Sequence, residues 1–229
     1  MQNEPLFLRK PIPVLYEDES YIVFDKPAGL LVIPTPQCEK NTLVNIVNHQ
    51  YAPSQGWRLH PCHRLDRETS GAILFAKGKQ CQKLMMGVFQ KRTVIKKYIA
   101  LVQGRLSKAA GELRSRVLDF DQKKYRKGSA GQWAITRYRM LQQKRVFGIV
   151  EVQPLTGRTN QIRIQFSEIG HPLVGERKYA RGRDYALKFR RAALHACALE
   201  WTQPVSHKRI HVTADLPDDM EVFIARNGN

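Results

Sequence analysis

The chain has 229 residues, 42% hydrophobic and 25% charged, so it can bury a sizeable core and is not expected to be disordered. Thirty-eight Lys and Arg residues against 20 Asp and Glu give a formal net charge of +18, which attracts polyanions. No apolar run is long enough to span a bilayer, and residues 1–5 do not begin a signal peptide, so we expect a soluble, cytoplasmic protein.

The first half of the chain predicts a mixture of strands and helices. Two short apolar runs at 14–16 and 21–24, separated by polar residues, indicate a hairpin, and Asp-Lys-Pro-Ala-Gly at 25–29 ends it with a turn. Thr42 is placed to cap a helix whose apolar positions follow at intervals of three and four. Three further elements are predicted: an apolar strand at 72–76, a helix at 80–89 and a strand at 98–102.

The second half begins with a polar, basic region at 108–131, for which we expect little regular structure. Alternating residues at 133–140 and an apolar run at 146–152 predict an antiparallel pair. A helix at 159–169 would place Arg158 and Thr159 near its N-terminus, where anions bind readily. Late strands are predicted at 194–201 and 209–214.

These elements predict an α+β fold. We expect a single domain over residues 1–229, with a mixed, largely antiparallel β-sheet flanked by helices and loops. Only about a dozen residues precede the first strand, so no separate N-terminal RNA-binding appendage is expected. Nothing in the sequence demands more than a monomer.

Cysteine and histidine spacing does not indicate a metal site. The four cysteines are scattered and form no Cys-x-x-Cys pair, so we interpret them as free thiols: Cys38, Cys62, Cys81 and Cys197. His63, His171 and His195 lack metal-ligand spacing. We therefore expect no metal.

Basic residues gather in three stretches. One contains Lys91, Arg92, Lys96 and Lys97, a second contains Lys123, Lys124, Arg126 and Lys127, and a third at 177–191 mixes seven basic residues with aromatic ones. Each alone could be a solvated loop, but three on one chain favour a nucleic acid, whose phosphates and bases they suit. An anionic membrane surface is the weaker alternative, because no amphipathic helix with a clean apolar face is evident.

The segment His-Arg-Leu-Asp-Arg-Glu-Thr-Ser-Gly at 63–71 is the candidate for chemistry. It places Asp66 between Arg64 and Arg67 on a turn-rich loop before an apolar strand. Nearby positive charge favours the carboxylate over the acid, so Asp66 could act as nucleophile or base. An ordinary surface ion-pair cluster is the alternative for this pattern alone.

Four stretches together resemble the RluA-type branch of the RNA pseudouridine synthases. They are Asp-Lys-Pro-Ala-Gly at 25–29, the 63–71 segment, Lys-Lys-Tyr-Ile-Ala at 96–100, and Leu-Thr-Gly-Arg-Thr-Asn-Gln-Ile-Arg at 155–163 with Gly-His-Pro-Leu-Val-Gly at 170–175. The 63–71 segment matches that family's catalytic loop almost letter for letter. The resemblance implies the pseudouridine synthase fold and an isomerase acting on ribosomal or transfer RNA.

The resemblance also implies roles for particular residues. Asp66 would be the catalytic aspartate, Tyr98 the active-site tyrosine near the uracil, and Arg163 the basic partner of Asp66. Arg64 would help to extrude the target uridine from stacked RNA. Substrate binding would further involve His63, Arg158, Thr159 and Gln161. No cofactor is implied, because the uracil ring leaves and rejoins the same ribose.

Two departures and three alternatives remain open. Asn160 and Gln165 stand where the family usually has histidine, which keeps hydrogen bonding but loses a titratable ring. Without the resemblance, Tyr98 would be a core aromatic and Arg163 a helix-face residue. The runner-up function is a catalytically inactive RNA-binding or RNA-folding protein on the same scaffold. An RNA hydrolase using Asp66 and His63 is a third option, with Glu68 as the nearest further carboxylate.

Overall fold

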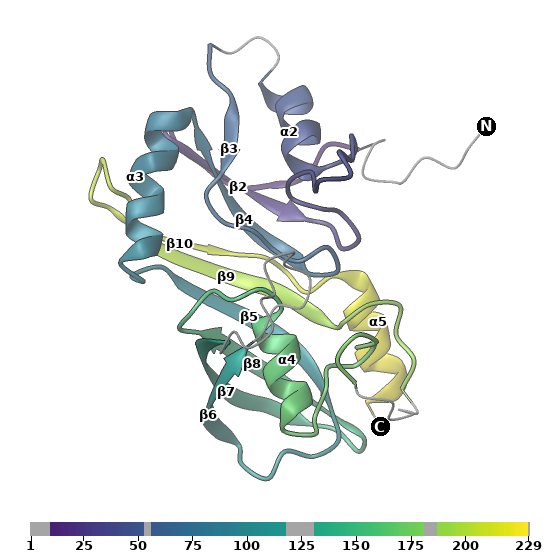
Figure 1. Ribbon diagram of the computed structural model, residues 1–229. Coiled ribbons are helices and arrows are strands. Elements are labelled where there is room, and N and C mark those ends of the chain that lie inside the picture. The colour runs from purple at the N-terminus through teal and green to yellow at the C-terminus, as the bar shows by residue number, and fades with distance from the viewer. Residues whose placement is uncertain (1–9, 53–55, 118–130, 181–186, 229) are drawn as a thin grey trace, which may run out of the picture. The chain divides into compact units, whose positions relative to one another are not determined.

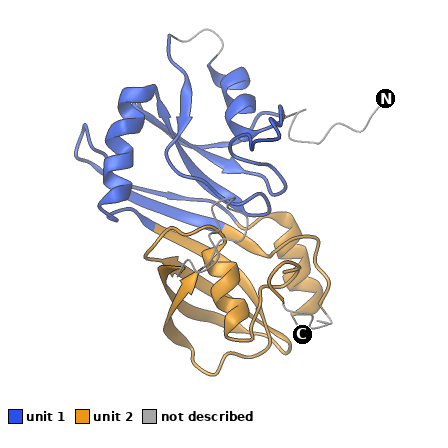
Figure 2. Ribbon diagram, viewed as in Figure 1, with its two compact units in different colours: residues 1–95, 196–215 blue, residues 96–195, 216–229 orange. Residues whose placement is uncertain are grey.

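The computed structural model describes residues 10–52, 56–117, 131–180 and 187–228 (Figure 1). These residues form two compact units, coloured separately in Figure 2. Unit 1 comprises residues 1–95 and 196–215, and unit 2 comprises residues 96–195 and 216–229. Each unit is described on its own.

Unit 1 is built on an antiparallel hairpin extended by further strands. β1 (Val14–Glu17) pairs with β2 (Tyr21–Lys26), and β2 pairs with β4 (Ser70–Lys77) from Tyr21 opposite Ala76 to Lys26 opposite Gly71. β9 (Leu194–Thr202) lies next to β4. Two short strands complete this part: β3 (Leu59–Pro61) pairs with β4, and β10 (Arg209–Thr213) pairs with β9.

The central strands of unit 1 are buried on both faces because a helix contacts each face. Tyr21 and Val23 share a core cluster with Met85 of α3 (Lys79–Gln90), and the Tyr21 hydroxyl donates to the Cys81 carbonyl at 3.0 Å. On the other face Phe24 contacts the rings of Phe75 and of Tyr51 in α2 (Leu43–Tyr51). Continuous apolar runs are typical of strands covered in this way.

Unit 2 has a four-stranded antiparallel arrangement in the order β5, β8, β7, β6. The strands are β5 (Ile95–Gln103), β6 (Ala110–Val117), β7 (Gln132–Gln143) and β8 (Phe147–Pro154). α4 (Gln161–Glu168) covers one face, where Phe166 meets Tyr138 edge to face at 5.8 Å between ring centroids. α5 (Asp218–Asn227) packs Met220 and Phe223 into a cluster with Phe147.

The α+β fold and its antiparallel character are confirmed, as are the hairpin, both early helices, the 133–152 pair and the late strands. The prediction of little regular structure at 108–131 is wrong for Ala110–Val117, which forms β6. This strand alternates exposed charged residues with half-buried ones, so β7 rather than an apolar run stabilises it. β3 and α5 were not predicted. No helix among the described residues is long and apolar enough to cross a membrane.

Phe24→Ala is expected to lower the free energy of unfolding by about 3–5 kcal/mol, because the ring is fully buried between Tyr51 and Phe75. Denaturant titration followed by circular dichroism measures the change. Val205→Ala removes a side chain that is 56% exposed and should change stability by less than about 0.5 kcal/mol. Equal effects of the two substitutions would contradict the packing described for unit 1.

Candidate active site

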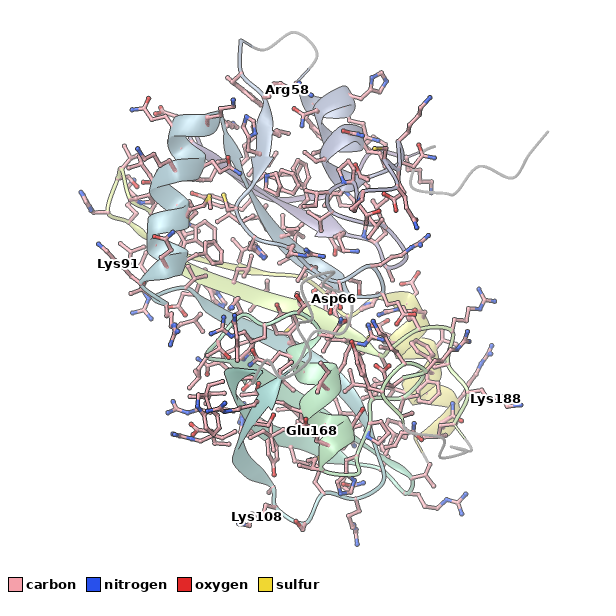
Figure 3. All side chains as sticks on the ribbon, viewed as in Figure 1. Arg58, Asp66, Lys91, Lys108, Glu168 and Lys188 are labelled. Atoms are coloured by element: carbon pink, nitrogen blue, oxygen red, sulfur yellow. The ribbon has the colours of Figure 1, made fainter. Side chains whose placement is uncertain are left out.

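Asp66 lies on the turn between β3 and β4 in unit 1 (Figure 3). The backbone N–H of Thr69 donates to the Asp66 carbonyl at 3.1 Å and closes the turn. Leu65 and Thr69, on either side, are 5% and 2% exposed, whereas Asp66 itself is half-buried. The turn is therefore anchored by its flanks, and these hold the carboxylate at the surface of the unit.

The buried ammonium of Lys26 ties this turn to the Pro-Ala-Gly turn that follows β2. Lys26 is fully buried, and its Nζ donates to the carbonyls of Leu30 at 2.7 Å, Pro27 at 2.9 Å and Arg67 at 3.3 Å. The two turns also bond directly, since Gly29 N–H donates to the Arg67 carbonyl and Arg67 Nε donates to the Gly29 carbonyl. Lys26 thus fixes the backbone next to Asp66.

The residues around the turn are placed by the start of β4. Gly71 has φ +107°, and a Cβ there would lie 2.3 Å from the Ala196 carbonyl oxygen, so only glycine fits. His63 accepts the Leu74 N–H at its Nε2 and contacts the Phe89 ring, which fixes its imidazole. Arg64 is exposed and extends from the same segment.

Tyr98 lies in β5 of unit 2, directly opposite Val152, which in turn faces Tyr138. Opposed residues share a face, and Tyr138 contacts Phe166 of α4, so Tyr98 lies on the face that α4 covers. Lys96, two residues earlier, points to the same face, and burial lowers its pKa below the usual value. Its Nζ lies near Gly157, just before α4.

Arg163 of α4 forms a buried, bidentate ion pair with Glu176. Its Nε donates to Glu176 Oε2 at 2.6 Å and its Nη2 donates to Oε1 at 2.9 Å. Glu176 also accepts the backbone N–H groups of Lys178 and Tyr179, and the Arg163 guanidinium lies over the Tyr179 ring at 5.4 Å. A charge-assisted fork of this kind holds the guanidinium in one orientation.

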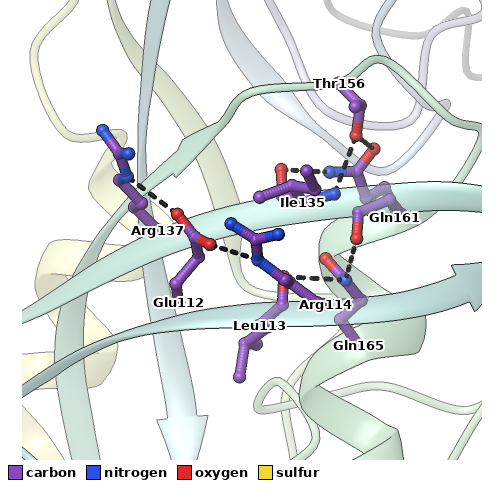
Figure 4. A network of polar contacts seen from close by, with 9 residues as sticks. Glu112, Leu113, Arg114, Ile135, Arg137, Thr156, Gln161 and Gln165 are labelled. Carbon is purple, nitrogen blue, oxygen red and sulfur yellow. Dashed lines mark hydrogen bonds and ion pairs between the residues drawn. The ribbon is translucent and has the colours of Figure 1, made fainter.

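The loop before α4 is held by Gln161, whose side chain is 4% exposed (Figure 4). Its Oε1 accepts from Thr156 Oγ1 at 2.7 Å and from Arg158 N–H at 3.0 Å. Its Nε2 donates to the Ile135 carbonyl and to Thr136 Oγ1. These four bonds occupy both ends of the Gln161 amide and hold the loop. The binding of substrate by Gln161 stays a prediction.

The two departures from histidine have structural uses. Asn160 is the N-cap of α4 with φ +53°, a conformation that asparagine tolerates, and its Oδ1 accepts from Arg163 Nη1 at 3.0 Å. Gln165 is 1% exposed; its Oε1 accepts from Thr136, and its Nε2 donates to the Ala134 carbonyl at 3.0 Å. Gln165 therefore fastens α4 to the sheet.

The predicted residues fall into both units. Unit 1 holds Asp66, His63 and Arg64, and unit 2 holds Tyr98, Arg163, Arg158, Thr159 and Gln161. The sequence did not predict the structural roles of Lys26 and Glu176, the buried charged residues that hold the turns and α4. In the sequence each is visible only as a charged residue beside a glycine turn. Within the described ranges no three His, Cys, Asp or Glu side chains converge as metal ligands, and the four cysteines are not paired in disulfides.

The basic stretches differ in their exposure. Lys91 and Arg92 are exposed after α3, and the stretch at 123–127 lies outside the described residues, as do positions 181–186 of the third stretch. Within the third stretch Arg191 is buried and pairs bidentately with Asp219 at 2.8 and 2.9 Å. Phe189 packs against Phe223. Part of this stretch therefore stabilises unit 2 instead of facing solvent.

The chain is similar in sequence to known proteins. Residues 20–168 match the family described as RNA pseudouridylate synthase. The chain is 31% identical to an uncharacterized RNA pseudouridine synthase, YhcT, of Bacillus subtilis, over 92% of this chain and 70% of that protein. It is 35% identical to the ribosomal large subunit pseudouridine synthase D of Xylella fastidiosa, over 94% and 69%.

Among solved structures, the human RNA pseudouridylate synthase domain containing 4 superposes with a TM-score of 0.76 at 25% identity. That similarity covers 93% of this chain and 92% of the human chain. Sequence and fold therefore lead to one conclusion: the chain belongs to the RNA pseudouridine synthase family, in its RluA-type branch, whose members are isomerases that convert uridine in RNA to pseudouridine.

Proposed function

We propose that this protein forms pseudouridine in ribosomal large-subunit RNA, with Asp66 as the catalytic carboxylate. Relatives named for the large ribosomal subunit, at 35% and 36% identity, support this substrate. The net charge of +18 suits a structured polyanion. We further propose that the protein works as a cytoplasmic monomer.

The observation that carries the proposal is the anchored turn of Asp66. A carboxylate that attacks or assists in a reaction must be held near its productive position, because small misplacements lower the rate strongly. Lys26 and Gly29 fix the backbone beside Asp66 through the Arg67 carbonyl. Arg64 and Arg67, both exposed, add positive charge that favours the ionised carboxylate and an RNA phosphate.

The reaction needs a carboxylate, a positive charge beside it and an aromatic phenol. The bond from uracil N1 to the ribose breaks, a bond from C5 to the same ribose carbon forms, C5 loses a proton and N1 gains one. Asp66 attacks the ring or assists its departure from the sugar, and Arg163 favours the ionised form of Asp66. Tyr98 stacks on the uracil and moves a proton.

The target uridine must leave the RNA stack before it can react. Flipping costs roughly a few kcal/mol, least for a nucleotide in a loop. Arg64 helps to extrude the target uridine, and His63, Arg158, Thr159 and Gln161 bind the RNA around it. Arg158 and Thr159 precede the N-terminus of α4, where backbone N–H groups suit a phosphate.

Asp66→Asn is expected to abolish pseudouridine formation while RNA affinity stays close to that of the wild type, because the amide keeps the shape and loses the nucleophile. Carbodiimide labelling, which adds mass selectively to pseudouridine, followed by mass spectrometry of unmodified large-subunit rRNA and tRNA transcripts incubated with the enzyme measures both product and substrate choice. Glu68→Gln removes a carboxylate two residues away and should stay active. Turnover by Asp66→Asn, or strand cleavage by the wild type, would refute the mechanism. If the wild type binds RNA but forms no pseudouridine, the alternative of an inactive RNA-binding protein is favoured.

Glu176→Gln is expected to lower kcat on the order of a hundredfold with a smaller change in KM, because Arg163 loses its buried ionic partner and its fixed orientation. Single-turnover kinetics on the same transcript separates the two effects. Glu168→Gln, at an exposed position on the same helix, removes the same charge and should leave kcat unchanged. Equal kcat values for the two variants would exclude a positioning role for Glu176.

A further inference from the structure

The face of the unit 2 sheet opposite α4 carries a cluster of arginines that the proposed reaction does not use. Side chains alternate along a strand, and Thr136 and Ser115 point to α4 through Gln165. Their neighbours therefore point to the other side. We call the following residues the arginine face: Arg114 and Arg116 of β6, with Trp133, Arg137 and Arg139 of β7.

The strand register brings these side chains together. Arg116 lies opposite Trp133, Arg114 opposite Ile135, and Glu112 opposite Arg137. The side chains of Arg114, Arg137 and Arg139 are 65%, 62% and 64% exposed. The arginine face thus presents guanidinium groups to solvent from two neighbouring strands.

Two glutamates arrange the arginines without neutralising them. Glu112 accepts from Arg114 Nε at 2.5 Å and from Arg137 Nε at 3.0 Å (Figure 4). Because these bonds use Nε, they do not require the terminal NH2 groups, which suit bidentate contact with a phosphate. Glu151 accepts from Arg139 Nη2 at 3.3 Å and from Lys97 Nζ at 3.4 Å. Four arginines and Lys97 against two glutamates leave a positive excess.

Trp133 adds a stacking surface beside the charges. Its side chain is 57% exposed, and the Arg116 guanidinium lies 5.4 Å from its ring centroid. Arg158 Nε donates to the Trp133 carbonyl, which fixes the backbone there. An exposed aromatic ring among arginines is the combination that proteins use to stack unpaired bases along a phosphate backbone.

We propose that the arginine face binds the backbone of an RNA segment flanking the target uridine, with one unpaired base stacked on Trp133. The inference rests on RNA as the substrate in the proposed function, and not on the role of Asp66. α4 with Arg163 covers the opposite side of the sheet, so this contact is separate from the Arg163 site within unit 2. Such binding adds affinity and orients the substrate without reading its sequence.

The test compares two double variants that change the net charge equally. Arg114→Gln with Arg137→Gln alters the arginine face, whereas Arg105→Gln with Arg145→Gln alters exposed arginines after β5 and between β7 and β8. Affinity for a labelled oligouridylate and for an unmodified large-subunit rRNA transcript is measured between about 50 and 200 mM salt. The face variant should reduce the slope of log affinity against log salt for the oligouridylate by about 0.7 for each lost phosphate contact, so about 1.4.

The control variant should keep the wild-type slope. Equal loss in both double variants would mean that only total charge matters, and an unchanged face variant would indicate a partner other than RNA; either result overturns the proposal. Thermal unfolding of each variant verifies folding. RNA affinity is measured independently of pseudouridine formation, so a failure of Asp66 chemistry is distinguishable from a failure of this binding.

Trp133→Ala should weaken oligouridylate binding by about fivefold to a hundredfold and affect an RNA duplex less, because a duplex offers no free base to stack. Trp133→Phe should restore most of the affinity. Equal weakening for both RNAs, or no rescue by phenylalanine, would exclude stacking.

Discussion

The buried ammonium of Lys26 is the constraint on which the local structure around Asp66 depends. A charge removed from water is tolerated only when strong acceptors surround it, and here backbone carbonyls from two separate turns serve this purpose. Their oxygens must converge on one point, so the Pro-Ala-Gly turn after β2 and the Asp66 turn before β4 are fixed together. Gly71, where only glycine fits against Ala196, sets where β4 begins.

In unit 2 a buried anion, the Glu176 carboxylate, holds the backbone as the Lys26 ammonium does in unit 1. Glu176 is buried and takes two backbone N–H groups as well as the Arg163 guanidinium, so the carboxylate organises both a loop and a helix. Arg191 and Asp219 form a comparable pair at α5. The basic residues behind the net charge of +18 therefore fall into a buried group and an exposed group. Lys26, Arg163 and Arg191 are buried and are held by protein groups, whereas the arginine face and the surface arginines near Asp66 are exposed to solvent.

The sequence predicted the parts of this protein whose signal is local. Apolar periodicity located α2, α3 and α4, and the 63–71 segment located the Asp66 turn. β6 was missed because its pattern is carried by charged residues whose partners, such as Arg137 for Glu112, lie on the next strand. Lys26 and Glu176 were missed for a related reason. A charged residue next to a glycine turn is usually solvated, and only tertiary contacts show that it is buried.

The amide side chains at 160, 161 and 165 make hydrogen bonds around α4, and two of them, at 160 and 165, stand where the family usually has histidine. Asn160 offers Arg163 an oxygen, Gln161 holds the loop before α4, and Gln165 bonds the helix to β6 and β7. An imidazole at 160 or 165 would change charge near neutral pH and would alter the donors and acceptors of the network. Amides do not titrate, so the hydrogen bonds that Asn160 and Gln165 make do not depend on the protonation state of a ring. Asn160 and Gln165 are therefore part of the hydrogen-bond network that positions α4 and Arg163, and neither is an unbonded remnant of a lost site.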